Sequence, residues 1–211
     1  MVAYLLSKWF QRIMKKVFAQ KKDVKLGLYG PPNAGKTTLA NRISMDWLGE
    51  EVGEVSAVAH ETREIQMKEK VTIRSGKKEL TFNLVDTPGI ATRIDYEDFL
   101  KAGLSKKEAK KRAKEATKGV IDAIKWLDDM DAVVVVVDAT QDPYSQVNVT
   151  IIGNLQARDI PVLIVANKID LKKANLKRVS DAFPQYDVIG ISARDAINID
   201  TLYESLFELI E

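Results

Sequence analysis

The sequence predicts an α/β protein with a doubly wound, mostly parallel six-stranded sheet, one antiparallel strand, and an additional N-terminal helix. Two observations support this fold class. Short runs rich in Val, Ile and Leu alternate with longer helical patterns, which is typical of a sheet covered by helices on both faces. In addition, residues 132–137 are apolar at every position, which indicates a strand buried on both faces of a parallel sheet.

The individual elements follow from where these patterns begin and end. Strands are predicted at residues 24–29, 65–74, 79–85, 132–138, 162–166 and 187–191. The second and third flank Ser75 and Gly76, which predicts an antiparallel hairpin. Helices are predicted at 36–47, from 105 onward, and at 199–210. Ligands of such sheets bind at the loops that leave the carboxyl ends of the strands, so these loops are where functional residues are expected.

The composition indicates a globular protein. The chain has 211 residues, of which 45% are apolar and 29% charged, enough for one domain with a sizeable core. It has no cysteine, which excludes disulfides and thiolate metal sites and fits a reducing interior. The longest apolar run is too short to cross a bilayer, and basic residues interrupt any N-terminal secretion signal. We therefore expect a cytoplasmic protein.

The charge is small in total but unevenly distributed. Residues 1–25 carry seven Lys or Arg and one Asp, and residues 101–118 carry eight Lys or Arg and two Glu. Each segment therefore has a local charge of +6 in a chain whose net charge is +2, and the remainder is acidic. Two basic segments on an acidic body favour a polyanionic partner.

The first motif is a glycine-rich loop between a predicted strand and a predicted helix. The pattern G-x-x-x-x-G-K-[ST] is matched by Gly30, Pro31, Pro32, Asn33, Ala34, Gly35, Lys36 and Thr37, with Thr38 next. Its backbone N–H groups can curve around phosphates, and the helix adds the positive end of its dipole. We expect Lys36 to reach the β and γ phosphates of a nucleotide and the Thr37 hydroxyl to ligate Mg²⁺.

The second motif is Asp-Thr-Pro-Gly, which places Asp86 and Gly89 just after the strand predicted at 79–85. A carboxylate in this position can hold Mg²⁺ directly or through water. The Gly89 N–H is unobstructed by a side chain and suits contact with a γ phosphate. The same four residues also occur in ordinary turns, so this motif depends on the others.

The third motif predicts the base. Asn167, Lys168 and Asp170 follow the strand predicted at 162–166. The Asp170 carboxylate can accept from both N1–H and the 2-amino group of guanine, a donor pair that adenine lacks. Each such charged hydrogen bond is worth about 1.5–3 kcal/mol. Asn167 is expected to join this loop to the phosphate loop and the base, and the Lys168 stem to cover the ring.

A fourth segment, Ser192, Ala193 and Arg194, follows the last predicted strand. Two interpretations are open. Its backbone N–H groups donate to guanine O6, or the segment is an ordinary turn at a helix entry.

Together and in this order, the four motifs resemble those of the Ras-like GTPase superfamily, most closely its Era-like, translation-factor-related branch. That branch shares Pro-Asn-x-Gly-Lys and Asp-Thr-Pro-Gly, and the resemblance covers residues 24–211. It implies a P-loop G domain that binds GTP or GDP with Mg²⁺ and hydrolyses GTP. It also implies a first-switch threonine that coordinates Mg²⁺ and senses the γ phosphate, and Thr62 lies where that residue belongs. The implied metal ligands are Thr37, Thr62 and Asp86.

The sequence departs from the Ras pattern at Ile90, where Ras-type proteins place a water-orienting glutamine. Because isoleucine forms no hydrogen bond, we expect slow hydrolysis, about 10⁻⁴ to 10⁻² s⁻¹ without assistance. In potassium-stimulated members an asparagine at the position of Asn33 helps hold K⁺, which predicts K⁺ stimulation. The alternative is that Asn33 only shapes the loop. The residues expected to act in hydrolysis are Lys36, Thr62, Gly89 and Asn33.

Residues 1–22 are predicted to form a basic amphipathic helix ahead of a GTP-binding domain at 23–211. Its apolar positions have helical spacing and include Val2, Leu6, Trp9, Ile13 and Val17. Three roles for residues 1–20 are open: packing on the domain, lying on an anionic membrane surface, or docking on a protein partner. We favour packing on the domain, and peripheral membrane association is an alternative localisation.

A basic helical insertion is predicted around residues 92–130. Ser105 and Glu108 form a capping box that opens a long helix. The inward positions of its first half are alanines, so we expect residues 105–118 to be weakly anchored and to project. The lysines there form either a solvated face or a surface for the phosphates of ribosomal or other structured RNA, because no aromatic residue is present for base stacking.

The sequence therefore predicts a molecular switch that hydrolyses GTP to GDP and phosphate, with RNA or the ribosome as the expected partner of residues 101–118. The alternative is a guanine-nucleotide-binding regulator that scarcely hydrolyses GTP and is recruited to a membrane or protein through residues 1–20. We expect a monomer, with a nucleotide-dependent dimer as the alternative.

Overall fold

The computed structural model describes residues 24–49, 65–75, 78–91, 96–101 and 103–210. The N-terminal helix predicted at 1–22 and the predicted switch residue Thr62 lie outside these ranges. Within them the strands are β1 (Lys25–Tyr29), β2 (Gln66–Ser75), β3 (Lys78–Asp86), β4 (Ala132–Asp138), β5 (Val162–Asn167) and β6 (Asp187–Ile191). Each lies within two residues of its predicted bounds.

The strands form one sheet in the order β2-β3-β1-β4-β5-β6. β2 pairs antiparallel with β3, and the other neighbours pair parallel. The predicted fold class is confirmed. Because β1, β3, β4 and β5 all point the same way, the loops that follow them meet at one edge of the sheet.

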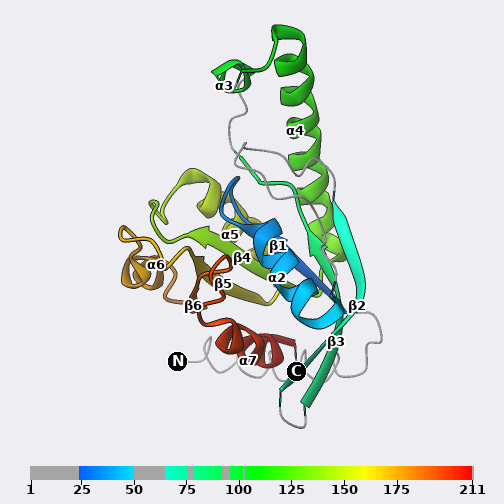
Figure 1. Cartoon of the computed structure of the whole chain (residues 1–211), viewed down its shortest axis with the longest axis vertical. Helices are drawn as coiled ribbons and strands as arrows, with labels where there is room; N and C mark the ends of the chain where they lie inside the picture. Colours follow the sequence, from blue (N-terminus) through cyan, green and yellow to red (C-terminus); the bar gives the residue numbers. More distant parts are fainter. Residues whose placement is uncertain (1–23, 50–64, 76–77, 92–95, 102, 211) are drawn as a thin grey trace.

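Helices cover both faces of this sheet (Figure 1). They are α2 (Lys36–Leu48), α3 (Tyr96–Lys101), α4 (Lys106–Trp126), the 3₁₀ turn η1 (Leu127–Asp129), α5 (Gln146–Gln156), α6 (Leu176–Ala182) and α7 (Ile199–Ile210). The residues of β4 divide between two cores: Val134 and Val136 pack with α2 and α7, whereas Val133 and Val135 pack with α5 and the end of α4. This alternation is the reason for the uninterrupted apolar run in the sequence.

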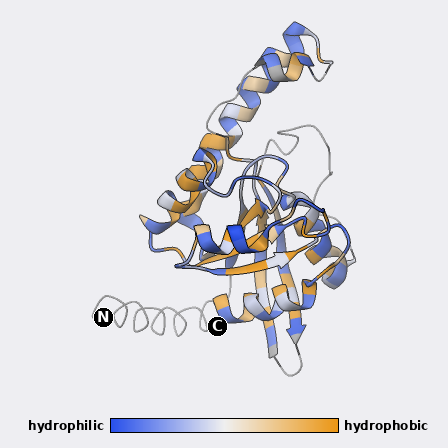
Figure 2. Cartoon of the chain, turned by 90° about the vertical axis from the view of Figure 1, so that its left-hand side faces the viewer, coloured by the Kyte–Doolittle hydropathy of each residue, from blue (hydrophilic) through white to orange (hydrophobic). Residues whose placement is uncertain are grey.

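The long helix α4 extends beyond the sheet, and α3 lies beside its far end (Figure 1). The predicted capping box is present, because the Glu108 N–H donates to Ser105 Oγ and the Ser105 N–H donates to Glu108 Oε2. A small apolar cluster, built around Phe99, Ala109 and Ala116, joins α3 to this half of α4. Figure 2 shows that the projecting half is largely hydrophilic, whereas hydrophobic residues gather in the central strands.

In the part of the chain that the structure describes, no helix combines the length and the apolar character needed to cross a membrane.

Candidate nucleotide-binding site

The glycine-rich loop lies between β1 and α2, at the edge of the sheet where the parallel strands end. Gly30 passes so close to the Val136 carbonyl that a Cβ would overlap it, and Gly35 adopts φ 97° directly against the Asn167 side chain. Both positions therefore require glycine. Asn33 is exposed and has φ 59°, a left-handed conformation that asparagine tolerates. This conformation is compatible with both of the roles considered for Asn33.

Lys36 lies inside this loop. Its Nζ donates to the carbonyl oxygens of Pro31 at 3.0 Å and Gly30 at 3.3 Å, and the residue is only 5% exposed. Burial lowers the pKa of Lys36 to about 8, although the nearby Asp86 carboxylate opposes this change. Among the described residues, the hydrogen-bond partners of this buried ammonium group are neutral carbonyls, so it is well placed to gain stability from an anionic ligand.

Asp86 and Thr37 form an oxygen-rich pair beside this lysine. Thr37 Oγ1 donates to Asp86 Oδ2 at 2.6 Å, and Asp86 is fully buried. Asp86 Oδ1 has no hydrogen-bond partner among the described residues. Burial raises the pKa of Asp86, opposed by the Thr37 hydrogen bond and by the Lys36 charge. A buried oxygen without a partner, beside a hydroxyl, fits a hard cation such as Mg²⁺.

Gly89 lies against the glycine-rich loop, because a Cβ on Gly89 would stand 2.7 Å from Pro32 Cα. The next residue, Ile90, donates its backbone N–H to the Gly30 carbonyl at 3.0 Å. The Ile90 side chain is 3% exposed and packs in the core cluster that includes Tyr29 and Val85. It therefore points away from solvent, and its role in the fold is to anchor this segment to the core.

The Asn167 loop joins the two ends of the site. Asn167 Nδ2 donates to the Ala34 carbonyl at 2.9 Å, and Asn167 Oδ1 accepts from the Ala193 N–H at 3.0 Å. Asn167 is buried, so both contacts are protected from water. One side chain thus connects the phosphate loop after β1 with the loop after β6.

The geometry reduces the number of backbone N–H groups in the segment Ser192–Arg194 that are available to donate to guanine O6. The Ser192 N–H donates to the Ile197 carbonyl, and the Ala193 N–H donates to Asn167. Of the three predicted donors, the Arg194 N–H is the one without an acceptor among the described residues. The sequence could not show this, because the acceptors come from residues that are distant in the chain or that follow the segment.

Asp138, at the end of β4, is a residue of the site that was not predicted from the sequence. Asp138 Oδ2 accepts from Lys168 Nζ at 2.7 Å, and Asp138 Oδ1 accepts from the Thr140 N–H and hydroxyl. Burial raises the pKa of Asp138, but the hydrogen bonds from Lys168 and Thr140 outweigh it and hold the pKa below its ordinary value. Its signal was an acidic residue directly after an apolar strand, the same signal that pointed to Asp86.

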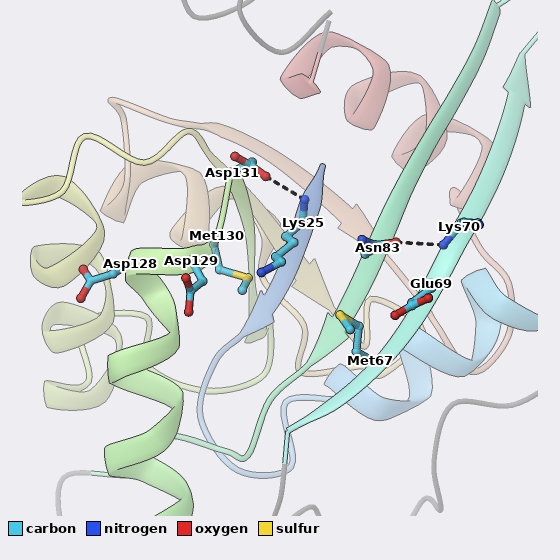
Figure 3. Close-up of a pocket in the computed structure, with 9 residues that line it drawn as sticks. All are labelled: Lys25, Met67, Glu69, Lys70, Asn83, Asp128, Asp129, Met130 and Asp131. Atoms are coloured by element: carbon cyan, nitrogen blue, oxygen red, sulfur yellow. Dashed lines mark hydrogen bonds between the residues drawn. The ribbon is translucent and has the colours of Figure 1, made fainter. Parts of the chain in front are cut away.

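A pocket of about 630 Å³ lies elsewhere, near the amino ends of β1 and β4 (Figure 3). Its lining residues are Lys25, Met67, Glu69, Lys70, Asn83, Asp128, Asp129, Met130 and Asp131. None of the predicted nucleotide-binding residues is among them. Two of its groups are joined to their neighbours, because the Lys25 N–H donates to Asp131 and the Lys70 N–H donates to Asn83.

The strand order, with a glycine-rich loop after β1, an aspartate at the end of β3 and Asn167 at the end of β5, defines a P-loop G domain. The model of a family described as "50S ribosome-binding GTPase" matches residues 25–168. The chain belongs to this family.

Two curated relatives illustrate the likeness. The chain is 29% identical over 192 residues to GTPase Era of Alkaliphilus oremlandii, covering 87% of this chain and 54% of the relative. It is 29% identical over 197 residues to GTPase Der of Borreliella afzelii, covering 89% and 40%. The chain thus spans about half the length of the curated relatives it matches. The predicted resemblance to Era-like GTPases is confirmed.

Two solved structures have the same fold. A variant of Aquifex aeolicus Era bound to GDP and AlF₄⁻ matches with a TM-score of 0.67 at 24% identity, over 90% of this chain and 58% of that one. An Era complex with MgGDPNP and nucleotides 1506–1542 of 16S ribosomal RNA matches with a TM-score of 0.68 at 23% identity, over 90% and 57%.

Proposed function

We propose that this chain binds GTP and hydrolyses it to GDP and phosphate as a molecular switch. The observation that carries the proposal is the Asn167 side chain, which bonds to both the phosphate loop and the Ala193 backbone. A single site can therefore hold both ends of a nucleotide. The family match and the Era structures with guanine nucleotides support this choice of ligand.

At the phosphate end, the backbone N–H groups of residues 30–37 and the Lys36 ammonium would bind the phosphate oxygens. Lys36 would exchange its two carbonyl partners for phosphate, a stronger acceptor. Thr37 and Asp86 would hold Mg²⁺, with Thr62, which lies outside the described residues, as a third ligand. When bound, Mg²⁺ neutralises phosphate charge that develops during phosphoryl transfer. Gly89, backed against Pro32, would sense the γ phosphate through its N–H.

At the base end, Asp170 would accept from guanine N1–H and the 2-amino group, and the Arg194 N–H would donate to O6. The Lys168 stem would cover the ring, held in place by the ion pair between Lys168 and Asp138. These contacts select guanine, because adenine has neither the donor pair nor the carbonyl.

Nucleotide binding is tested by competition between fluorescent GDP and unlabelled GDP, GTP or ADP. We expect GDP and GTP to compete with the fluorescent GDP and ADP to bind at least about a hundredfold more weakly. A site that hydrogen-bonds a polar group of its ligand strongly rejects an analogue that lacks this group. Lys36→Ala should weaken nucleotide binding strongly. Lys172→Ala is the control, because Lys172 is exposed and lies beyond Asp170, and it should not weaken binding. Equal affinity for ADP and GDP would contradict the proposal.

Hydrolysis is tested by single-turnover measurements with Mg²⁺ in KCl, NaCl and an organic-cation salt at matched ionic strength. We propose that K⁺, held with the help of Asn33, supplies the charge stabilisation that Ile90 cannot. Faster turnover in KCl alone, abolished by Asn33→Ala, would support this. Equal rates in all three salts would remove the K⁺ role, and no turnover would favour the regulator that binds without hydrolysing.

We further propose that the projecting half of α4 contacts phosphates of structured RNA. The exposed basic residues in the part of α4 from residue 106 to 118 are Lys106, Lys107, Lys110, Lys111, Lys114 and Lys118. The family description names the ribosome, and one Era structure contains a 16S RNA fragment, which supports the choice of partner. Replacing Lys107, Lys111 and Lys114 by Gln should weaken RNA binding and reduce the salt slope by about 2 to 3. A Lys172→Gln, Lys173→Gln variant is the control, and an unchanged slope would contradict the proposal.

The role of residues 1–22 stays a proposal, because they lie outside the described residues. We propose that this basic amphipathic segment packs on the domain. Liposome flotation of the full chain, with and without residues 1–22, would reveal the membrane alternative.

A further inference from the structure

Asp170, the carboxylate proposed to read guanine, is held by an arginine from another loop. Arg194 Nη2 donates to Asp170 Oδ2 at 2.8 Å. The Asp170 side chain is 10% exposed, whereas that of Arg194 is 70% exposed. The nearly buried carboxylate is therefore oriented by a charged group that approaches from the solvent side. Because an ionised carboxylate has acceptor sites on both oxygens, Asp170 Oδ1 can still accept from a base.

The guanidinium group is itself fixed in orientation. Arg194 Nε donates to Asp195 Oδ1 at 2.9 Å, and Nη2 donates to Asp195 Oδ2 at 3.2 Å. Two parallel hydrogen bonds set the plane of the guanidinium group, which a lysine ammonium cannot reproduce. The same nitrogen, Nη2, then faces Asp170.

The backbone that carries Arg194 is held by α2, the helix that follows the glycine-rich loop. Arg42, on α2, donates from Nε to the Ala193 carbonyl at 3.4 Å and from Nη2 to the Arg194 carbonyl at 3.3 Å. Arg42 also pairs with Asp46 at 3.7 Å, and the Tyr203 hydroxyl donates to Asp46 at 2.7 Å. Contacts therefore run from α7 and α2 to the loop after β6, and from Arg194 in that loop to Asp170.

We propose that Arg194 is a positioning residue that holds the Asp170 carboxylate toward the N1–H and 2-amino groups of guanine, and that Arg42 fixes the loop that carries Arg194. This inference rests on the proposed function. It assigns to the two arginine side chains a share in base selectivity. Neither side chain needs to touch the nucleotide for this role.

The test compares GDP with IDP, whose base lacks the 2-amino group. Dissociation constants are measured for wild type, Arg194→Ala, Arg194→Lys, Arg42→Ala and Arg74→Ala. The last is a matched control, because Arg74 pairs with Glu79 at the same 2.8 Å on the distant β2-β3 hairpin. We expect Arg194→Ala to lower the preference for GDP over IDP roughly three- to tenfold, since a misaligned carboxylate loses the 2-amino contact first. The preference of Arg194→Lys for GDP over IDP should lie between those of Arg194→Ala and wild type. Arg42→Ala should lower this preference as well, and Arg74→Ala should leave it unchanged.

The outcomes separate the inference from the proposed function. If wild type prefers GDP to IDP and Arg194→Ala keeps the same ratio at an unchanged melting temperature, the positioning role is overturned and the function stands. If Arg194→Ala binds GDP more tightly, Arg194 competes with the base, and the inference is again overturned. If wild type does not distinguish GDP from ADP, the proposed function itself fails. A loss of affinity that is equal for GDP and IDP would assign the arginine a purely structural role, contrary to the inference.

Discussion

Single residues decide the chemistry of this site because each is placed by contacts that exclude water. Asp86 and Lys36 are charged groups that burial alone would disfavour. Desolvation is the largest cause of both pKa shifts: it lowers the pKa of Lys36 and raises the pKa of Asp86, so burial makes each charge more costly to keep. A cation at Asp86 and an anion at Lys36 would each relieve that cost, which fits a magnesium–nucleotide ligand.

Asp170→Asn should change the base preference from guanine to xanthine. An amide would place an N–H donor where the carboxylate accepted, so the 2-amino group of guanine would lose its acceptor. Xanthine, with a carbonyl at the same position, would gain a donor. We expect GDP affinity to fall by roughly a hundredfold and XDP to bind more tightly than GDP. Competition binding measures both, and retention of tight GDP binding would show that Asp170 does not read the base.

The ion pair between Asp138 and Lys168 predicts a pH dependence. Because the folded pKa of Asp138 lies below the ordinary value of 3.8, the pair stabilises the fold fully above that value. This stabilisation is lost as the pH falls through the folded pKa. Asp138→Asn should therefore be less stable than wild type by a constant amount near neutral pH, and the difference should shrink below about pH 4. Urea unfolding at several pH values measures this, and a difference independent of pH down to 3 would argue against it.

At the scale of the elements, α4 combines a firmly packed end with a weakly packed one. Its buried positions are small residues, namely Ala109, Ala116, Gly119 and Ala123. Such residues allow close approach but bury little apolar area. The first half of α4 therefore depends on its cap and on α3 more than on the sheet.

Ser105→Ala should loosen this half of the helix. The substitution removes the oxygen that accepts from the Glu108 N–H, which costs about 1 kcal/mol. Amide hydrogen exchange in residues 106–118 should become several times faster, while exchange in the central strands stays unchanged. If exchange rises equally throughout the chain, the cap acts on global stability and not on α4 alone.

The elements were predictable where local pattern dominates. The strand at 132–138 follows from its apolar run, and the capping box at Ser105 from two residues three positions apart. The contacts of Arg42 with the Ala193 and Arg194 carbonyls and of Asp138 with Lys168 were not predictable, because these partners lie 30 or more residues away. The bulge in β2, where Lys70 adopts φ 56°, was missed because a charged, alternating segment gives no sign of an extra residue.

At the scale of the whole molecule, β1, which leads into the glycine-rich loop, is joined to the root of α4, the C-terminal end of this helix around Ala123. The Tyr29 hydroxyl donates to the Ala123 carbonyl at 2.9 Å, and both residues are fully buried. Tyr29 directly precedes Gly30, so this bond connects the two parts of the molecule proposed to bind nucleotide and RNA.

Tyr29→Phe should weaken that connection with little change in packing. The Ala123 carbonyl would lose its tyrosine donor, which is worth about 1 kcal/mol in global stability. Guanidinium unfolding measures the loss. We also expect the effect of GTP on RNA affinity to decrease, because the phosphate loop and α4 would be less tightly coupled. A variant that is destabilised yet shows the full nucleotide effect would assign that coupling to other contacts.

The length of α4 gives this arrangement a mechanical consequence. The rod from Ala123 to Lys106 is roughly 25 Å long at 1.5 Å per residue, so a tilt of about 10° at its root would carry the far end about 4 Å. Displacements too small to disturb the core could thus swing a row of lysines by more than half the spacing between neighbouring phosphates of a nucleic acid strand.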